Sequence, residues 1–312
     1  MERDPKEFTS KYTIATVVKM KNGHAWFDRM EEGVKKFKVD TGHNAFLVGP
    51  AHADEHLQAQ LIEQLLQKPV DALCIVPYFP QALELILRQA CKQGIIVVAH
   101  EASNLRNCQY DLEPFDNAAY GIHLMDHLAH YMHAKGEYLT ILGSLTTKSH
   151  SEWANAAITH QIDTYPQMSM ATRKIEDHDD PMIAYQKTKE LLVAFPNLRG
   201  ILGIGMTCTE GAGRAIAELG LQEKIAVVGT GLVSACGTYL KNGANKLISF
   251  WDPADAGYVL NILAVMALQN ESVVDGVNLK IPGYTHIKTE RQILYGSAWI
   301  DVTKENMLQY QF

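Results

Sequence analysis

The chain of 312 residues has few cysteines, and their spacing fits no metal or redox motif. The five are Cys74, Cys91, Cys108, Cys208 and Cys236. An odd count without any C-x-x-C argues against a zinc knuckle and against a complete disulfide framework. Cys74 lies in an apolar run, so we expect it to be a plain core residue.

Long apolar runs and an excess of positive charge are also lacking. No run reaches the ~18 residues that a bilayer-spanning helix needs. Lys and Arg total 28 against 35 Asp and Glu, and the net charge of −7 argues against nucleic acid as the main partner. With 47% hydrophobic residues the chain can bury large cores. Its length allows two domains of roughly 150 residues each.

Several catalytic and cofactor motifs are absent. Two G-x-G pairs, at 203–205 and 229–231, follow expected strands, but neither continues as G-x-G-x-x-G. The sequence contains no P-loop and no G-x-S-x-G nucleophile motif. No nucleophile is paired with an obvious base. We therefore expect no catalytic residues, no cofactor and no enzymatic activity.

Two histidine patterns could suggest a metal, and each has a plainer explanation. Residues 52–56 spell H-x-x-E-H, an inverted zinc-protease motif, yet His52 precedes the expected helix, so the two histidines would not share a helical face. A second set recurs at helical spacing, opposite an apolar face: His123, His127, His130 and His133. We expect these side chains to be solvated and no metal to be required.

Strands and helices alternate along most of the chain, which predicts parallel sheets with helices on both faces. The expected strands are 13–18, 44–48, 72–76, 95–99, 138–142, 169–175, 200–204, 226–229 and 246–250. The expected helices are 26–41, 55–67, 80–93, 117–134, 151–164, 181–194, 209–219, 233–242 and 254–269. The alternation breaks at 104–115 and again at 251–258, and we place a domain boundary at about 103–115. Residues 271–312 are typical of short strands and loops.

Polar and aromatic residues gather where these strands end. The stretch 12–33 gives a strand, then Lys19, then Trp26 and Phe27 at a helix start, and 138–157 repeats this order with Trp153. Two such halves facing each other would form an interdomain cleft at the carboxyl ends of their strands. The candidate ligand-binding residues are Lys19, Trp26, Phe27, His100, Glu101, Ser149, His150, Trp153, Met206, Trp251 and Asp252. Charged groups suit sugar hydroxyls and aromatic rings suit sugar faces, so we expect a neutral polyhydroxy ligand.

Another acidic group, at positions 177, 179 and 180, directly precedes Pro181. Acidic side chains before a proline are typical of a helix N-terminus, where they cap the backbone and meet the positive end of the helix dipole. We therefore interpret this group as structural.

The order and spacing of several segments resemble the type I periplasmic sugar-binding proteins of ABC importers. The most specific segment is KNGANKLISFWDPADAGY at 241–258. Others are VVK at 17–19 followed by Trp26-Phe27, VDALCIV at 70–76, QGIIVVAHE at 93–101 and IAVVGTGL at 225–232. The branch that binds rhamnose or autoinducer-2 is the most similar.

The resemblance implies two doubly wound parallel-sheet α/β domains joined by a multi-segment hinge. It implies an N-terminal domain at 1–110 with a returning segment at about 253–285, and a C-terminal domain at 111–252 with a segment at about 286–312. The ligand would be a monosaccharide, deoxy sugar or polyol, and the partner a membrane permease. The protein would be a periplasmic monomer that binds no nucleic acid. The N-terminus is polar without a signal-peptide core, so either the protein is cytosolic or, as the resemblance implies, a signal has been removed.

The family's ligand residues map onto this chain with several departures. Its first-strand lysine matches Lys19, and its Trp-Asp pair matches Trp251-Asp252. An aspartate after the fourth strand falls on Glu101, and an acid–amide or amide–amide pair falls on Ser149-His150. A proline and an alanine of the autoinducer-2 branch fall on Ile204 and Met206. These departures make autoinducer-2 a less favoured ligand. The alternatives are the effector domain of a sugar-responsive repressor, autoinducer-2-type signal binding, and an enzyme built on His52, Glu55 and His56.

Overall fold

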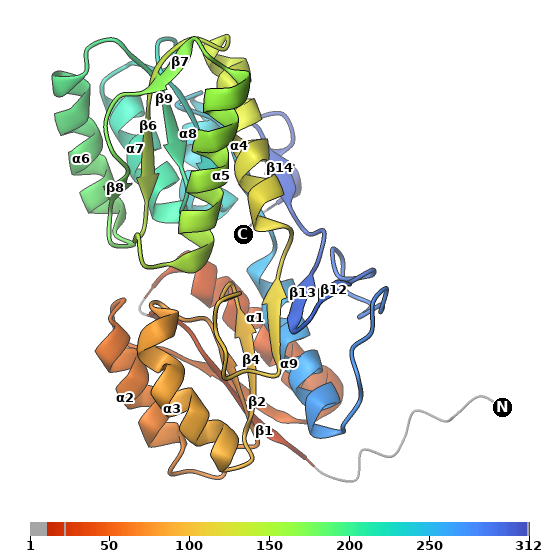
Figure 1. The fold of residues 1–312 in the computed structure, drawn as a ribbon. Helices are drawn as coiled ribbons and strands as arrows, with labels where there is room; N and C mark the ends of the chain where they lie inside the picture. Colours follow the sequence, from red (N-terminus) through yellow and green to blue (C-terminus); the bar gives the residue numbers. More distant parts are fainter. Residues whose placement is uncertain (1–10, 22, 311) are drawn as a thin grey trace.

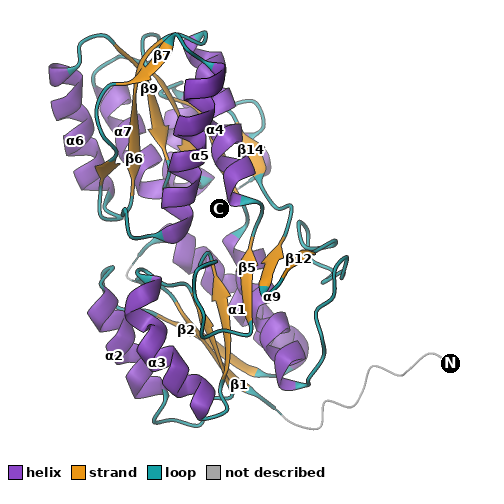
Figure 2. Ribbon diagram, in the orientation of Figure 1, coloured by secondary structure: helices purple, strands orange, loops and turns teal. Residues whose placement is uncertain are grey.

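Two seven-stranded sheets organise the chain, and each is the centre of an α/β domain (Figures 1 and 2). The computed structural model describes residues 11–21, 23–310 and 312. Residues 1–10, which hold most of the polar N-terminal segment, lie outside the described residues. Within the described part, no helix is both long and apolar enough to cross a lipid bilayer.

The first sheet has the strand order β12-β13-β5-β4-β3-β1-β2. Its strands are β1 (Thr13–Val17), β2 (Asn44–Val48), β3 (Ala72–Ile75), β4 (Ile96–His100), β5 (Tyr110–Glu113), β12 (Lys288–Glu290) and β13 (Ile293–Tyr295). All neighbours are parallel except β12 and β13. Helices α1 (Ala25–Thr41) and α9 (Pro253–Leu268) cover one face, and α2 (Glu55–Leu65) and α3 (Pro80–Lys92) cover the other.

The second sheet has the order β14-β11-β10-β9-β6-β7, with β8 also paired to β6. Its strands are β6 (Gly136–Leu142), β7 (Met168–Met170), β8 (Ile175–Glu176), β9 (Leu198–Gly203), β10 (Ala226–Thr230), β11 (Asn245–Phe250) and β14 (Ile300–Val302). The helices are α4 (Asn117–Met132), α5 (Lys148–Thr164), α6 (Pro181–Ala194), α7 (Met206–Glu218), α8 (Val233–Lys241) and the short η1 (Met307–Gln309). Helices α4 and α5 pack together on one face, and α6 and α7 pack together on the other.

The chain crosses between the domains three times, at residues 114–116, 251–252 and 296–299. This arrangement confirms the predicted fold class. The second crossing coincides with the expected boundary at 252–253, whereas the first and third crossings differ from the expected boundaries. Strand β5, at the end of a stretch expected to be irregular, belongs to the first sheet. Strands β12 and β13 also belong to it, so the segment expected to enter the second domain at about 286 joins that domain's sheet only at β14.

Four of the described helices begin at aspartates whose side chains accept backbone N–H groups. Asp54, Asp116, Asp180 and Asp252 cap α2, α4, α6 and α9 in this way. A proline follows the cap of α6 and of α9, where its missing N–H costs nothing. The expected helices at 181–194 and 254–269 therefore agree with the structure at these ends to within one residue.

Helices α1 and α9 lie unusually close because α1 has a glycine at their contact. A Cβ placed on Gly33 would stand 1.8 Å from the carbonyl oxygen of Ala254, so any side chain there would force the helices apart. This approach brings the start of α1 against the second crossing. Trp26 and Trp251 consequently meet edge to face, with ring centroids 4.6 Å apart.

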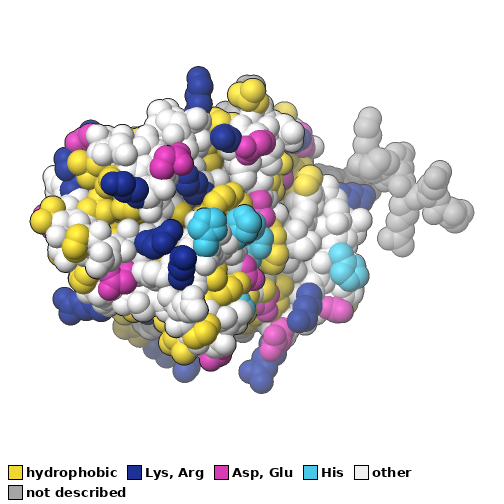
Figure 3. Space-filling model, turned by 90° about the horizontal axis from the view of Figure 1, so that it is seen from above, with side chains coloured by type: hydrophobic (Ala, Val, Ile, Leu, Met, Phe, Trp, Pro, Cys, Tyr) yellow, Lys and Arg dark blue, Asp and Glu magenta, His cyan; other side chains and the backbone are white. Residues whose placement is uncertain are grey.

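The surface at the far end of the second domain carries both signs of charge. Figure 3 shows basic and acidic side chains interspersed on this face, with histidines gathered in one place. A nucleic-acid interface is typically a continuous basic stripe. This face does not present one.

Candidate functional site

A cavity of about 440 Å³, counting the solvent in its mouth, lies between the two domains. It sits at the carboxyl ends of the parallel strands, where ligands bind in open α/β sheets. The first domain and second crossing contribute Lys19, His24, Trp26, Phe27, Glu101 and Trp251. The second domain contributes His150, Trp153, Asp179, Gly205, Met206, Thr207 and Thr230.

Three tryptophans form a rigid aromatic wall. The ring of Trp251 is the centre: it meets Trp26 at 4.6 Å and Trp153 at 5.7 Å, both edge to face. Trp153 is held in place because its indole N–H donates to the Asn117 side chain. The three indoles are at most 7% exposed. Flat apolar faces that are fixed in this way suit the aliphatic face of a small ring.

Several polar atoms of the cavity lining are buried and have no hydrogen-bond partner among the described residues. They are His24 Nδ1, Glu101 Oε1, Asp179 Oδ2 and Trp251 Nε1. Most buried polar groups in proteins are hydrogen-bonded, and an unpaired one costs free energy. Their gathering around one cavity indicates a site that takes a polar guest.

His150 presents a neutral donor to the cavity. Its Nδ1 accepts the backbone N–H of Gly143 at 3.2 Å, so the neutral ring carries its proton on Nε2. Burial, followed by the charge of Lys19, lowers the pKa of His150 to about 3 against the opposing effect of Asp179. Burial also lowers the pKa of His24. Both rings are therefore uncharged at neutral pH.

Asp179 faces Lys19 across the cleft. Burial is the largest effect on this carboxyl and opposes its ionisation, but Lys19 and the nearby His150, His24 and His178 together outweigh burial, so the pKa of Asp179 lies below its ordinary value. No ion pair joins the two side chains directly in the described structure, which leaves each free to bind a third group. A ligand between them would meet a donor from the first domain and an acceptor from the second.

The neighbouring Asp177 positions this acceptor. Its carboxylate accepts the backbone N–H of Asp179 at 3.0 Å and the hydroxyl of Thr207 at 2.9 Å. Burial, followed by the nearby Asp179, raises the pKa of Asp177 to about 7. The capping role expected for this acidic group belongs to Asp180 alone, whose side chain accepts from Met182. The prediction was wrong for Asp179, which lines the cavity.

Eight of the eleven candidate residues line the cavity: Lys19, Trp26, Phe27, Glu101, His150, Trp153, Met206 and Trp251. His100 lies behind it, fully buried, with Nδ1 bonded to the Leu112 carbonyl and its ring 6.2 Å from Trp251. Ser149 is also fully buried and outside the lining.

Asp252 is the third candidate outside the lining, and its predicted contact with the ligand is not supported. Its carboxylate accepts two hydrogen bonds from Arg29, at 2.9 and 2.6 Å, and one from the backbone of Ala254. As the N-cap of α9, it points back over the helix start instead of into the cleft. It therefore ties α9 to α1.

The sequence analysis missed five lining residues: His24, Asp179, Gly205, Thr207 and Thr230. All but His24, which precedes helix α1, lie within four residues of a strand end, so the general rule pointed to the correct region. Asp179 is marked by its backbone conformation in the structure, a signal that the sequence does not carry. Like Glu101, it has a left-handed backbone, with φ of 55° against 57°, which is uncommon outside glycine.

The two histidine patterns of the sequence have different surroundings in the structure. In the 52–56 motif, α2 begins only at Glu55 and the imidazole of His56 is 84% exposed, so its residues form no three-residue metal cluster in the described structure. On α4, the solvated face that we expected is only partly present. His123 and His127 are 22% and 32% exposed, and both contact Asp301.

Comparison with known proteins gives a match to a sequence family and a similar curated protein. Residues 14–272 match the sequence family described as periplasmic binding protein domain. The D-allose-binding periplasmic protein of Escherichia coli is 24% identical over 251 residues, which cover 78% of this chain and 80% of that protein.

Two solved structures superpose on nearly the whole chain. An ABC transporter solute-binding protein from Clostridium phytofermentas with bound L-rhamnose has a TM-score of 0.87 at 19% identity and covers 96% of this chain and 98% of its own. LsrB from Clostridium saccharobutylicum in complex with AI-2 has a TM-score of 0.87 at 17% identity, covering 96% and 100%. These neighbours confirm the predicted fold.

Proposed function

The chain belongs to the periplasmic binding protein family, and we propose that it is a solute-binding protein that captures a small neutral carbohydrate between its two domains. A monosaccharide, a deoxy sugar and a polyol all fit this description. After capture, it delivers the ligand to the membrane permease of an ABC importer. The names of its relatives support this class of ligand.

The observation that carries the proposal is the pairing of unpartnered polar atoms with aromatic walls in one cavity. Glu101 and Asp179 offer acceptors, whereas Lys19 and the indole N–H of Trp251 offer donors. A sugar hydroxyl both donates and accepts, so a ring of hydroxyls can satisfy both kinds of group at once. The tryptophan faces cover the remaining C–H surface.

The charges of the cavity favour a neutral ligand. One ammonium, from Lys19, faces the two carboxyl side chains of Glu101 and Asp179. An anionic ligand would meet two acids in a partly desolvated space, and such like-charge contacts are costly. Hydroxyls avoid this cost and still gain charge-assisted hydrogen bonds.

Capture by two domains also supports transport. A ligand that bonds to Lys19 and Asp179 bridges the cleft, so it favours the closed arrangement of the two domains over any open one. We propose that this closed form is what the permease recognises, that the protein acts as a periplasmic monomer, and that the ligand leaves unchanged. The net charge of −7 is consistent with a partner other than nucleic acid.

A thermal-shift screen tests the proposal. The panel contains pentoses, hexoses, deoxy sugars, polyols and AI-2, and hits are measured by calorimetry. A ligand at 100 times its Kd adds about 2.7 kcal/mol to the free energy of unfolding, which raises Tm measurably. NMR of the ligand after long incubation checks turnover. Absence of any hit in the panel, or conversion of the hit into a new compound, would contradict the proposal.

A further inference from the structure

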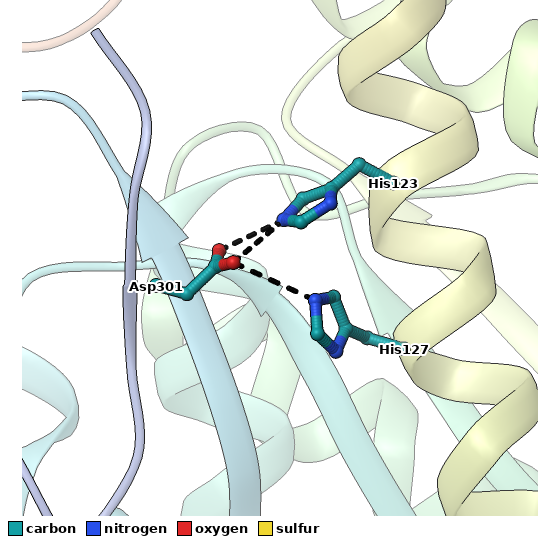
Figure 4. A group of neighbouring side chains, drawn as sticks. All are labelled: His123, His127 and Asp301. Atoms are coloured by element: carbon teal, nitrogen blue, oxygen red, sulfur yellow. Dashed lines mark hydrogen bonds and ion pairs between the residues drawn. The ribbon is translucent and has the colours of Figure 1, made fainter.

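Outside the ligand cavity, helix α4 and strand β14 bring two histidines and an aspartate together (Figure 4). His123 Nε2 lies 2.9 Å from each carboxylate oxygen of Asp301. His127 Nε2 lies 3.5 Å from Oδ2 of the same carboxylate. Figure 4 shows both imidazoles pointing away from α4 toward the carboxylate.

The fold dictates this meeting. His123 and His127 are one helical turn apart, so they share a face of α4. Asp301 lies 178 residues later than His123, in β14, which pairs antiparallel with β11 at the edge of the second sheet. His130 and His133, which continue the same spacing in the sequence, do not join the group.

We propose that His123, His127 and Asp301 bind one divalent transition-metal ion of the Zn²⁺ type. Two imidazole nitrogens and one carboxylate are a donor set that such ions prefer. The three ligand atoms lie within 4.8 Å of one another. Water fills the remaining coordination positions, because the side chains are between 22% and 32% exposed and the site is open to solvent.

The observed distances are close to those that a metal requires. Two ligand atoms bound to one tetrahedral Zn²⁺ at about 2.0–2.1 Å stand roughly 3.3 Å apart. The nitrogen–oxygen distances of 2.9 and 3.5 Å lie on either side of this value. Small rotations of the two imidazoles are therefore enough to admit the ion.

The ring protons do not obstruct binding. Metal coordination through Nε2 requires the proton of each ring to sit on Nδ1. Neither Nδ1 accepts a hydrogen bond from another described residue, so the proton can move there. The bound ion would fasten the edge strand β14 to α4. It would thus anchor the segment that follows the third interdomain crossing.

Trp299 reports on the site. Its ring stacks on His123 with centroids 5.1 Å apart and an interplanar angle of 17°. The other three tryptophans line the ligand cavity. A paramagnetic ion such as Cu²⁺ at His123 should therefore quench the fluorescence of Trp299. The Trp299→Phe variant lacks this fluorophore, so the difference in quenching between the wild type and the variant gives the contribution of Trp299.

Calorimetric titration of the tag-free, chelator-treated full chain with Zn²⁺ tests the proposal. We expect one ion per chain at micromolar concentration. His127→Ala and Asp301→Asn should each weaken binding by at least about tenfold, since even outer-shell partners are worth roughly 10- to 100-fold. His130→Ala, on the next turn of the same helix, is the matched control and should bind as the wild type does.

Two results would overturn the proposal. One is a wild-type chain that takes up no Zn²⁺ at micromolar concentration. The other is a loss of affinity in His130→Ala as large as that in His127→Ala, because binding would then belong to the exposed histidines of α4. Circular dichroism shows whether each variant is folded, and the two independent ligand variants keep the test valid if one of them is not.

Discussion

The sharpest test of the proposed cavity compares two adjacent aspartates. Asp179 lines the cavity and its Oδ2 has no hydrogen-bond partner among the described residues, whereas Asp180 caps helix α6 through the backbone N–H of Met182. The change to alanine is chemically the same at both positions. Asp179→Ala should weaken ligand binding, and Asp180→Ala should lower stability without affecting binding.

The magnitudes follow from the two environments. A hydrogen bond to a charged group is worth roughly 1.5–3 kcal/mol. Each 1.4 kcal/mol is about tenfold in affinity. Losing the Asp179 carboxylate should therefore raise Kd by about 10- to 150-fold. Loss of the Asp180 cap should lower the free energy of unfolding by about 0.5–2 kcal/mol.

Calorimetry with the best ligand of the screen, together with denaturant titration of the free proteins, measures both effects. Binding is compared only under conditions where each variant is fully folded. A wild-type Kd in Asp179→Ala would refute the reasoning, because the ligand would then make no contact with this acceptor of the second domain. Equal losses of affinity in the two variants would also refute it, since the cause would be a general disturbance of the loop.

Three further predictions concern other charged groups. Lys19→Ala should raise Kd by about 10- to 100-fold, because it too removes a charged hydrogen-bond partner of the ligand. The control is Lys241→Ala, at the end of α8, for which calorimetry should give the wild-type Kd. Asp252→Ala should leave Kd unchanged but lower the free energy of unfolding, measured by denaturant titration, by about 1–3 kcal/mol. The variant loses both the cap of α9 and the pair with Arg29. A large loss of affinity would instead show that Asp252 contacts the ligand. Burial raises the pKa of Asp111 to about 7 from 3.8, so the folded state binds more protons than the unfolded state in that interval, and stability should fall as pH rises through it. Asp111→Asn should make the pH dependence of unfolding measured by denaturant less steep, and an unchanged slope would contradict this assignment.

The two acids of β5 also explain why this strand of the first sheet was not predicted from the sequence. The strand reads Tyr-Asp-Leu-Glu, a polar stretch that pattern rules assign to a loop. In the structure Asp111 and Glu113 are both fully buried. Burial raises the pKa of each, so these carboxyls stay protonated to a higher pH than exposed ones. Local hydropathy cannot anticipate that a neighbouring loop will cover these side chains.

The strand-end rule located most of the cavity because it depends only on topology. Parallel strands end at one edge, so any residue just beyond them lies near the cleft. Lys19, Glu101 and Trp251 were predictable on this ground. What the rule cannot give is the direction of a side chain. Asp180-Pro181 and Asp252-Pro253 are the same dipeptide at two helix starts, and both aspartates turn back onto their own helices.

Backbone conformation separates these caps from the acids that face the ligand. Asp180 and Asp252 have extended backbones, with φ of −122° and −71°, whereas Glu101 and Asp179 have φ near +56°. A left-handed conformation in a residue other than glycine has a conformational cost of order 1–3 kcal/mol. Glu101 comes from the first domain, directly after β4, and Asp179 from the second, shortly after β8. Each domain therefore contributes to the cavity one acid with a left-handed backbone. These two acceptors lie outside the repeat of residues 12–33 and 138–157, so the repeat does not predict them.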